Sequence, residues 1–246
     1  MPETIFSVQL FATCLVDAIR PAAGLATLRL LERLGVKVIV PSGQTCCGQP
    51  AFNSGCLADA RAMARYTIDL LEKSPVPIVV PSGSCGDMIV HRYRELLADD
   101  PAYASKAERV AARTYELSQY LSDVLKVQDV GAQCRRTITY HPSCHLLRGL
   151  GVRSAPSQLL DSIADARCVS LPGAEDCCGF GGTFAVKMGE LSSAMLNRKL
   201  DAIVESGADT VVACDAGCLM HIEGGLKRRG SNVAVRHLAE VLVESE

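Results

Sequence analysis

The sequence lacks tryptophan, is poor in aromatic residues and has almost no excess of charge. Aromatic residues make up 4% of its 246 positions, and 25 basic against 27 acidic residues give a formal net charge of −2. Binding of nucleic acid requires a basic surface for the phosphates or aromatic side chains for stacking, so nucleic acid is not an expected partner. No apolar run approaches the roughly 20 residues that span a bilayer, and the amino terminus carries Pro2 and Glu3 in place of a basic stretch. We therefore expect a cytoplasmic protein without a membrane span.

Cysteine, in contrast, is abundant, and eight of the twelve cysteines form a pattern that occurs twice. Each copy has a single cysteine, an adjacent pair followed by glycine, and a last single cysteine. The first set is Cys14, Cys46, Cys47 and Cys85, and the second set is Cys144, Cys177, Cys178 and Cys218. The interval between equivalent cysteines hardly changes from the first cysteine of each set to the last. Because this register holds along both halves of the chain, the sequence predicts a duplicated site.

The composition favours metal binding by these thiols over disulfide bonds. With 48% hydrophobic residues, the chain can bury a core without the bridges that small secreted proteins need, so its thiols stay available as thiolate ligands. Four thiolates in each set suit a soft multi-sulfur site, which indicates iron–sulfur clusters.

Two alternatives to iron–sulfur clusters stay open. Four thiolates also suit the closed tetrahedral zinc site of a structural or scaffold protein, and the adjacent pairs can act as the dithiols of a thiol–disulfide oxidoreductase. Zinc ribbons draw their ligands from short knuckles, whereas here the adjacent pair is separated from each single cysteine of its set by a whole βα unit. This wide spacing favours a site built from separate loops.

Strand and helix patterns alternate along both halves of the chain. Short β-branched runs predict strands, and apolar residues at helical spacing predict the helices between them. The alternation predicts an α/β fold of two pseudo-symmetric repeats at residues 1–130 and 131–246, each a parallel sheet flanked by helices and each ending in a comparable helix. The predicted strands are residues 4–10, 36–40, 77–80, 137–141, 167–171 and 210–213, and the predicted helices are residues 25–34, 57–71, 87–97, 106–125, 157–163, 184–205, 219–229 and 237–242.

Every cysteine of the two sets lies in a loop that follows a predicted strand. In a parallel sheet such loops gather at the carboxyl ends of the strands, where binding sites form, so the thiols of each set can meet. Each loop also leads into a helix, whose unpaired N–H groups lower the pKa of a thiol and donate hydrogen bonds to sulfur. Neighbouring side chains of an extended chain point apart, and Gly48 and Gly179 permit the sharp turn that brings both thiols of a pair to one site.

Several residues near the cysteines have no counterpart in the other copy. His141 and His145 flank a cysteine only in the second copy, so they are not part of the duplicated ligand set. His145 and Arg148 are candidates for binding a small carboxylate substrate or relaying a proton. His221 is either a hydrogen-bond donor to a cluster sulfur or an exposed helix residue. The remaining cysteines are expected to be packing or surface thiols, and they are Cys56, Cys134, Cys168 and Cys214.

The duplicated Cys…Cys-Cys-Gly…Cys arrangement resembles the cysteine-rich CCG domain family, which includes one component of heterodisulfide reductase and the iron–sulfur subunit of glycolate oxidase. Over nearly the whole chain, the sequence is very similar to the lactate utilization protein A family. The stretches that carry this likeness are FATCLVD at 11–17, GQTCCGQPAFNSG at 43–55, PSGSC at 81–85, HPSCHLLRGLG at 141–151, CCGFGGTFAVK at 177–187 and AGCLMHIEGGLKRRG at 216–230. The resemblance implies an iron–sulfur electron-transfer subunit of a cytoplasmic oxidoreductase complex that converts L-lactate to pyruvate, working with partner subunits.

One departure from the heterodisulfide reductase pattern concerns the last cysteine of each set. That pattern ends in Cys-x-x-Cys, whereas this chain has Ser82 before Cys85 and Asp215 before Cys218. A cluster with five cysteine ligands would lose one thiolate in each copy. We therefore predict four cysteine ligands per site and two [4Fe–4S] clusters, with zinc binding and a heterodisulfide-type thiol–disulfide oxidoreductase as alternatives. The sequence carries no flavin or nicotinamide fingerprint, so any hydride-accepting step is expected in another subunit.

Overall fold

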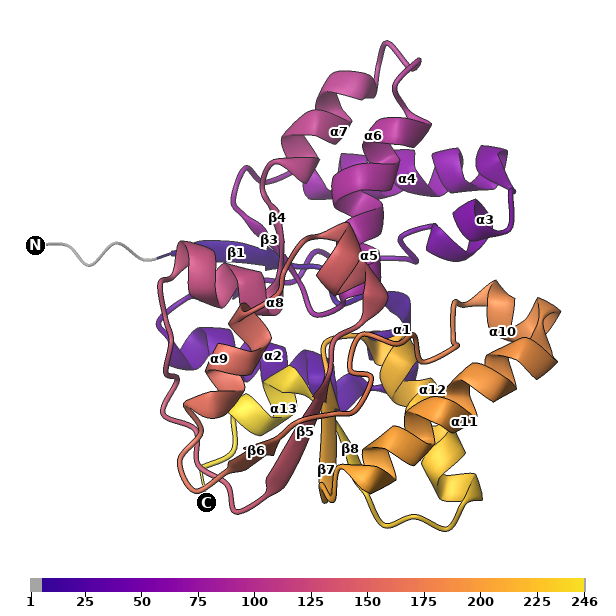
Figure 1. Cartoon of the computed structure of the whole chain (residues 1–246). Helices are drawn as coiled ribbons and strands as arrows, with labels where there is room; N and C mark the ends of the chain where they lie inside the picture. The colour runs from indigo at the N-terminus through magenta and orange to yellow at the C-terminus, as the bar shows by residue number, and fades with distance from the viewer. Residues whose placement is uncertain (1–5, 246) are drawn as a thin grey trace, which may run out of the picture.

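The structure, a computed structural model, describes residues 6–245 and contains two four-stranded parallel sheets flanked by helices (Figure 1). The strand orders are β2-β1-β3-β4 and β6-β5-β7-β8, which are the same order in the two repeats. The predicted α/β fold of two repeats, each with a parallel sheet, is therefore confirmed. The strands are β1 (Ser7–Leu10), β2 (Lys37–Ile39), β3 (Ile78–Val80), β4 (Thr114–Glu116), β5 (Thr137–His141), β6 (Arg167–Val169), β7 (Thr210–Ala213) and β8 (Ala234–His237).

Helices occupy equivalent positions in the two repeats. In the first they are α1 (Cys14–Ile19), α2 (Pro21–Arg33), α3 (Gln49–Asn53), α4 (Leu57–Leu71), α5 (Gly83–Asp87), α6 (Tyr93–Leu96), α7 (Ala104–Ala111) and α8 (Leu117–Gln119). In the second they are α9 (Ala155–Asp161), α10 (Thr183–Lys187), α11 (Gly189–Glu205), α12 (Ala216–Arg228) and α13 (Leu238–Leu242). The π-helical turns are η1 (Met88–Arg92), η2 (Tyr120–Val124) and η3 (His145–Gly149). Within residues 6–245, no helix is both long and apolar enough to cross a membrane.

The structure corrects two predicted helices. Residues 106–125 do not form one helix but contain most of α7, the strand β4, α8 and η2. This prediction was wrong because Thr114 leaves the helix to pair with Ile78 of β3, and the strand sequence, TYE, is not a run of β-branched residues. Strand β8, with the sequence AVRH, has no counterpart among the predicted strands either. The predicted helix at 184–205 is divided into α10 and α11 at Met188, whose φ of −124° and ψ of 50° are not helical.

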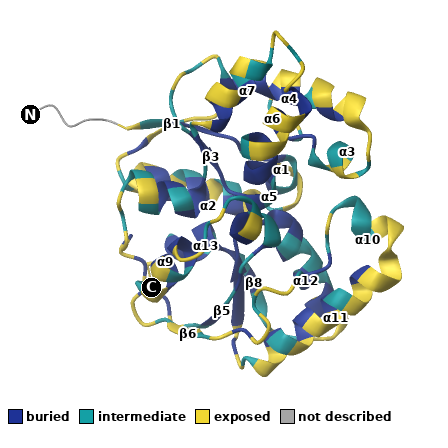
Figure 2. Cartoon of the chain, turned by 45° about the horizontal axis from the view of Figure 1, so that its top comes forward, coloured by how far each residue is buried: buried dark blue, intermediate teal, exposed yellow. Residues whose placement is uncertain are grey.

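Each repeat has a hydrophobic cluster of its own, and one further cluster contains residues of both repeats. Helix α2 of the first repeat packs on α13 of the second, and α8 packs on α9, so equivalent helix pairs join the repeats about a pseudo-twofold axis. Leu30 and Leu31 of α2 lie in one buried cluster with Leu238, Val241 and Leu242 of α13. Figure 2 shows this buried layer and the exposed outer sides of α10 and α11. Both repeats contribute residues to this cluster. The boundary between the repeats at residues 130 and 131 therefore stays a prediction.

The closing helix of each repeat begins with a fully buried polar residue at the repeat interface. The carboxylate of Glu116 caps α8 by accepting a hydrogen bond from the N–H of Ser118 at 2.7 Å. His237 caps α13 by accepting from the N–H of Ala239 at 3.1 Å, and its Nε2 donates to the carbonyl oxygen of Pro81 in the first repeat at 3.1 Å. The contacts between the repeats are therefore polar as well as apolar.

Glu116 predicts a pH dependence of stability. Burial, together with the Asp215 carboxylate, raises the pKa of Glu116 from 4.5 to about 7. The folded state therefore keeps a proton that the unfolded state releases above pH 4.5, so this contribution to stability is present at low pH and is lost as the pH rises through 7. Glu116→Gln removes the titration. The difference in free energy of unfolding, Glu116→Gln minus wild type, should increase by on the order of 1 to 3 kcal/mol when the pH is raised from about 5 to 8.

Urea unfolding of both proteins at the two pH values measures this relative change. Glu108→Gln is the matched control, because that carboxylate is 59% exposed on α7 and should leave the comparison with wild type unaltered. The account would be contradicted if the free energy of unfolding of Glu116→Gln differed from that of wild type by the same amount at both pH values.

Candidate metal centres

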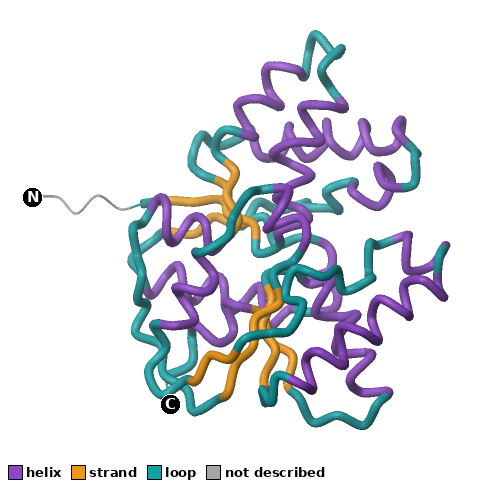
Figure 3. Tube along the Cα trace, viewed as in Figure 1, coloured by secondary structure: helices purple, strands orange, loops and turns teal. Residues whose placement is uncertain are grey.

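Both sets of cysteines lie at the carboxyl ends of strands, as the sequence predicts. The segments that follow β1, β2 and β3 carry the first set, and those that follow β5, β6 and β7 carry the second. The adjacent pairs lie in loops, whereas Cys14, Cys85 and Cys218 lie in the first turns of α1, α5 and α12. In Figure 3 these strand ends approach each other in the middle of the molecule, where α5 contacts η3 and α1 contacts α12. The N–H of Gly83 donates to the carbonyl oxygen of Cys214 at 3.0 Å across this contact. The carboxyl edges of the two sheets therefore face each other.

In both sets the single cysteines contact the adjacent pair. The Sγ atoms of Cys47 and Cys85 are 3.4 Å apart, and the equivalent distance in the second set is 3.3 Å. The thiol of Cys14 interacts with that of Cys46, and the equivalent contact is present in the second set. The four sulfur atoms of each set thus form one continuous group, although they come from three separate loops.

A glycine with left-handed backbone follows each adjacent pair. Gly48 has a φ of 88° and Gly179 a φ of 87°. The N–H of each glycine donates to the Sγ of the first cysteine in its pair, at 3.5 Å and 3.3 Å. A side chain does not fit at this turn, because a Cβ on Gly179 would lie 2.6 Å from the carbonyl oxygen of Ser192. The turn folds the chain back so that both thiols of a pair reach one site.

The hydrogen bonds within each set favour the thiolate form of one cysteine. Hydrogen bonds from Cys14 and Cys47, together with the N–H of Gly48, lower the pKa of Cys46 to about 2. Equivalent hydrogen bonds lower the pKa of Cys177 to about 2. The same contacts, with burial, raise the pKa of the thiols that donate these hydrogen bonds. A metal that binds all four sulfur atoms of a set must therefore displace protons.

All eight cysteines of the two sets line one cavity of about 330 Å³. Loops of both repeats form its walls. Apart from the cysteines, its titratable lining side chains are His145 and Asp215, and none of the described lining residues is Arg or Lys. The predicted ligands therefore converge on one space between the repeats.

Asp215 connects the two sets. One oxygen of its carboxylate caps α12 by accepting hydrogen bonds from the N–H groups of Gly217 and Cys218, at 3.1 Å and 3.4 Å. The other oxygen accepts from the hydroxyl of Ser82 at 3.0 Å and from the N–H of Ser84 at 2.9 Å in the first repeat. The residue is 4% exposed. One buried carboxylate therefore fixes the loops of the last cysteine in both sets against each other.

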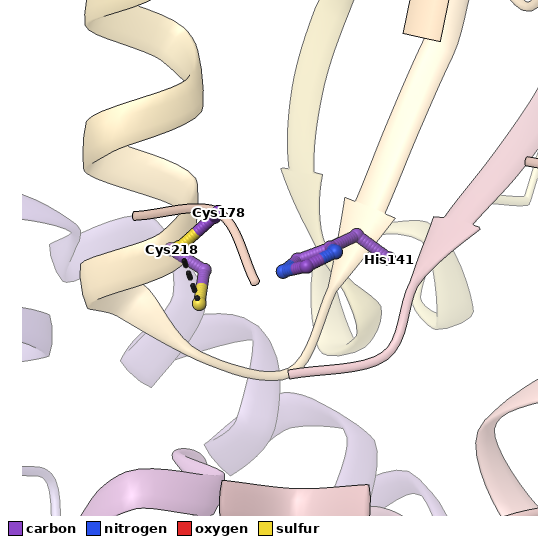
Figure 4. A group of neighbouring side chains, drawn as sticks. All are labelled: His141, Cys178 and Cys218. Carbon is purple, nitrogen blue, oxygen red and sulfur yellow. Dashed lines mark hydrogen bonds between the residues drawn. The ribbon is translucent and has the colours of Figure 1, made fainter. Parts of the chain in front are cut away.

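His141 lies closer to the second set than the sequence indicates. It ends β5 and is fully buried, and one ring nitrogen lies within 4.8 Å of the sulfur atoms of Cys178 and Cys218 (Figure 4). The backbone of Ala174 lies close enough to His141 to act on the pKa of its ring. No contact of either ring nitrogen, or of the buried hydroxyl of Ser143, has the geometry of a hydrogen bond. Burial lowers the pKa of His141 to about 4, so the ring is neutral. The one sequence signal for this role is that a histidine precedes the first cysteine only in the second copy.

The other candidate side chains differ in their relation to the cavity. His145 borders it. Arg148 is not among the described lining residues, and its guanidinium donates to the carbonyl oxygen of Glu175 at 2.6 Å. The Nε2 of His221 lies 3.3 Å from the hydroxyl oxygen of Ser192.

The cysteines outside the two sets are packing or surface thiols. Cys56 and Cys168 are exposed, whereas Cys134 and Cys214 are buried, and all twelve cysteines are free. The Sγ of Cys214 lies 3.7 Å from the hydroxyl of Tyr140.

The residues present fit a soft metal centre in each repeat. Each set offers four thiols in mutual contact, which is the donor chemistry of zinc and iron–sulfur sites. Next to the second set, His141 and Ser143 keep buried polar atoms without a partner in the protein. Such atoms are rare in folded proteins, and a bound group at the thiols would give them one.

Comparison with known proteins agrees with this arrangement. The family model CCG, described as a cysteine-rich domain, matches residues 8–90 and 138–223, which are the cysteine-bearing parts of both repeats. The chain is thus a protein of two cysteine-rich CCG domains. "Lactate utilization protein A" from Bacillus cytotoxicus is 47% identical and that from Geobacillus sp. is 48% identical, each over 96% of this chain and 98% of the relative. The Bacillus subtilis protein of the same name is 47% identical over the same shares. The chain belongs to the lactate utilization protein A family.

A solved structure supports the fold. The crystal structure of a hypothetical protein from Helicobacter pylori matches 98% of this chain with a TM-score of 0.63 and 12% sequence identity, and the match spans 49% of that protein. At this identity the likeness concerns the fold alone.

Removing the Asp215 carboxylate should loosen both sets at once. Asp215→Ala leaves the N–H groups of Ser84 and Gly217 without an acceptor, and each lost buried hydrogen bond costs about 1 to 3 kcal/mol. We expect the free energy of unfolding to fall by about 2 to 4 kcal/mol in a urea titration.

The matched control for this variant is Asp201→Ala. The side chain of Asp201 is 70% exposed and pairs with Arg229 on the surface, so its loss should change the free energy of unfolding by less than about 0.5 kcal/mol. An effect at Asp215 no larger than this control would show that the carboxylate does not hold the loops together.

Proposed function

We propose that the chain binds two [4Fe–4S] clusters, one at each set of cysteines, and transfers electrons as a subunit of a cytoplasmic complex that oxidises L-lactate to pyruvate. The observation that supports this proposal most strongly is the convergence of all eight thiols on one cavity. Two redox centres that border the same space can exchange electrons within one protein. The proposed ligands are Cys14, Cys46, Cys47, Cys85, Cys144, Cys177, Cys178 and Cys218.

The volume of the cavity favours iron–sulfur clusters over zinc. Thiolates select zinc, copper(I) and iron–sulfur clusters among biological metals. A structural zinc site closes four ligands on a single ion. Here both sets border a cavity of about 330 Å³, which offers room for a group of several atoms.

The protein groups around the thiols would tune such centres. A bound iron–sulfur cluster accepts and releases electrons at a potential that depends on hydrogen bonds to sulfur and on solvent exposure. The N–H groups of Gly48 and Gly179 supply one such hydrogen bond in each set. Cys47 and Cys178 are each 2% exposed, so the sulfur atoms of these two residues are shielded from water.

The assignment to lactate oxidation rests on the relatives. Proteins named "Lactate utilization protein A" match this chain over nearly its full length at 47% identity. A carboxylate substrate is commonly held by Arg, and none of the described residues that line the cavity is Arg or Lys. His145 is the lining residue that can relay a proton at the cavity.

Metal analysis and EPR spectroscopy of anaerobically purified protein test the proposal. We expect about eight iron and eight sulfide ions per chain, as two [4Fe–4S] clusters contain. The reduced protein should show two EPR signals. Cys47→Ser should remove one signal and Cys178→Ser the other, because each variant takes a thiolate from one set only. Cys56→Ser, at an exposed thiol outside both sets, should keep both signals.

Three results would contradict this assignment. A colourless protein with zinc and no iron would identify a structural scaffold. Loss of two thiols per set on mild oxidation, without release of metal, would identify a dithiol oxidoreductase. Loss of the same signal in Cys47→Ser and Cys178→Ser would identify one shared centre in place of two.

A further inference from the structure

The two sets have different surroundings although their backbones repeat. His141 follows Phe11 at the same interval in the sequence as Cys144 follows Cys14, so the two positions are equivalent. Both His141 and Phe11 are fully buried at the carboxyl end of the first strand of their sheet. The second set therefore has an imidazole where the first set has an aromatic hydrocarbon.

A buried lysine adds a second difference. The glycine after each adjacent pair packs on a methionine, which is Met63 of α4 in the first repeat and Met195 of α11 in the second. In this register, Lys199 of α11 is equivalent to Thr67 of α4. Lys199 is 1% exposed, and its Nζ donates to the carbonyl oxygens of residues 173 and 174 at 2.7 Å and 3.1 Å. Burial lowers the pKa of Lys199, and the Asp176 carboxylate and the cysteines of the second set oppose this shift and favour the ammonium form. The first set has no equivalent cation at this position.

His141 is positioned to donate a hydrogen bond toward the second set. One of its ring nitrogens lies within 4.8 Å of the sulfur atoms of Cys178 and Cys218, which Figure 4 shows in front of the ring. A buried polar group without a partner costs free energy, yet neither ring nitrogen makes a hydrogen bond of normal geometry in the protein, and the nearest backbone influence is that of Ala174. An imidazole carries at least one N–H in either protonation state, so this capacity to donate does not depend on pH.

We propose that His141 donates a hydrogen bond to a sulfur atom of the second centre and, with the Lys199 ammonium, makes that centre easier to reduce than the first. This inference rests on the proposed iron–sulfur function. Reduction adds negative charge, which a hydrogen bond and a nearby cation stabilise more strongly than they stabilise the oxidised state. With a cluster bound at each set, a reduced first centre would pass one electron to an oxidised second centre. No covalent bond forms or breaks in this step.

The backbone does not account for this difference. The N–H groups of Gly48 and Gly179 donate to sulfur in both sets at similar distances. Cys47 and Cys178 are equally buried. The inequality of the two centres therefore follows from side chains, and it can be removed by substitution.

A potentiometric EPR titration of the full chain, purified anaerobically, tests the inference. In wild type, the second centre, whose signal disappears in Cys178→Ser, should be reduced at a higher potential than the first centre. His141→Phe introduces the residue of the first set. It should lower the ratio of reduced to oxidised second centre at least tenfold at a given potential, a shift of about 59 mV for one electron, and leave the first signal unchanged.

Two further variants separate a hydrogen bond from a structural role. His141→Gln keeps an N–H donor and should retain most of the wild-type midpoint. Lys199→Met should lower the same midpoint without a change at residue 141, which keeps the inference testable if His141→Phe fails to bind iron.

The results that overturn the inference differ from those that overturn the proposed function. With both signals and the full iron content present, an unchanged midpoint in His141→Phe or Lys199→Met would overturn it. Strong nitrogen hyperfine coupling from His141 in pulsed EPR would also overturn it, because the residue would then be an iron ligand. Wild-type protein without any iron signal would contradict the iron–sulfur function itself.

Discussion

The site depends on contact between the carboxyl edges of two parallel sheets across the repeat interface. Equivalent helix pairs, α2 with α13 and α8 with α9, hold the repeats together through one apolar core. The buried carboxylate of Asp215 then joins the loops of the last cysteines by accepting hydrogen bonds from both repeats. Without this contact each sheet would present four thiols at its own edge. With it, all eight thiols border one cavity.

The two positions that depart from the heterodisulfide reductase pattern have a structural role here. Ser82 and Asp215 occupy the positions where that pattern has a further cysteine. In this chain the hydroxyl of Ser82 donates a hydrogen bond to the carboxylate of Asp215 at 3.0 Å. The same positions thus connect the repeats in place of offering a fifth thiol to each site. This arrangement agrees with four cysteine ligands per set, and it links the stability of the interface to the geometry of both sets.

Much of this organisation follows from the sequence, and the rest depends on packing. The inner strands of both sheets and the loops with the cysteines are predictable, because runs of β-branched residues predict the strands and the segments with glycine and cysteine that follow them predict the loops. The strands β4 and β8 are not, since their sequences, TYE and AVRH, contain no run of β-branched residues. The shared cavity and the approach of His141 to the second set arise from contacts between segments far apart in the chain, which no local pattern encodes.

The most direct test of the account is a crystal structure of the anaerobically purified protein with anomalous diffraction measured at the iron absorption edge. The account predicts two separate groups of iron peaks beside the cavity, one within bonding distance of the four sulfur atoms of each set. A single group of peaks, or peaks that appear only at the zinc edge, would contradict it.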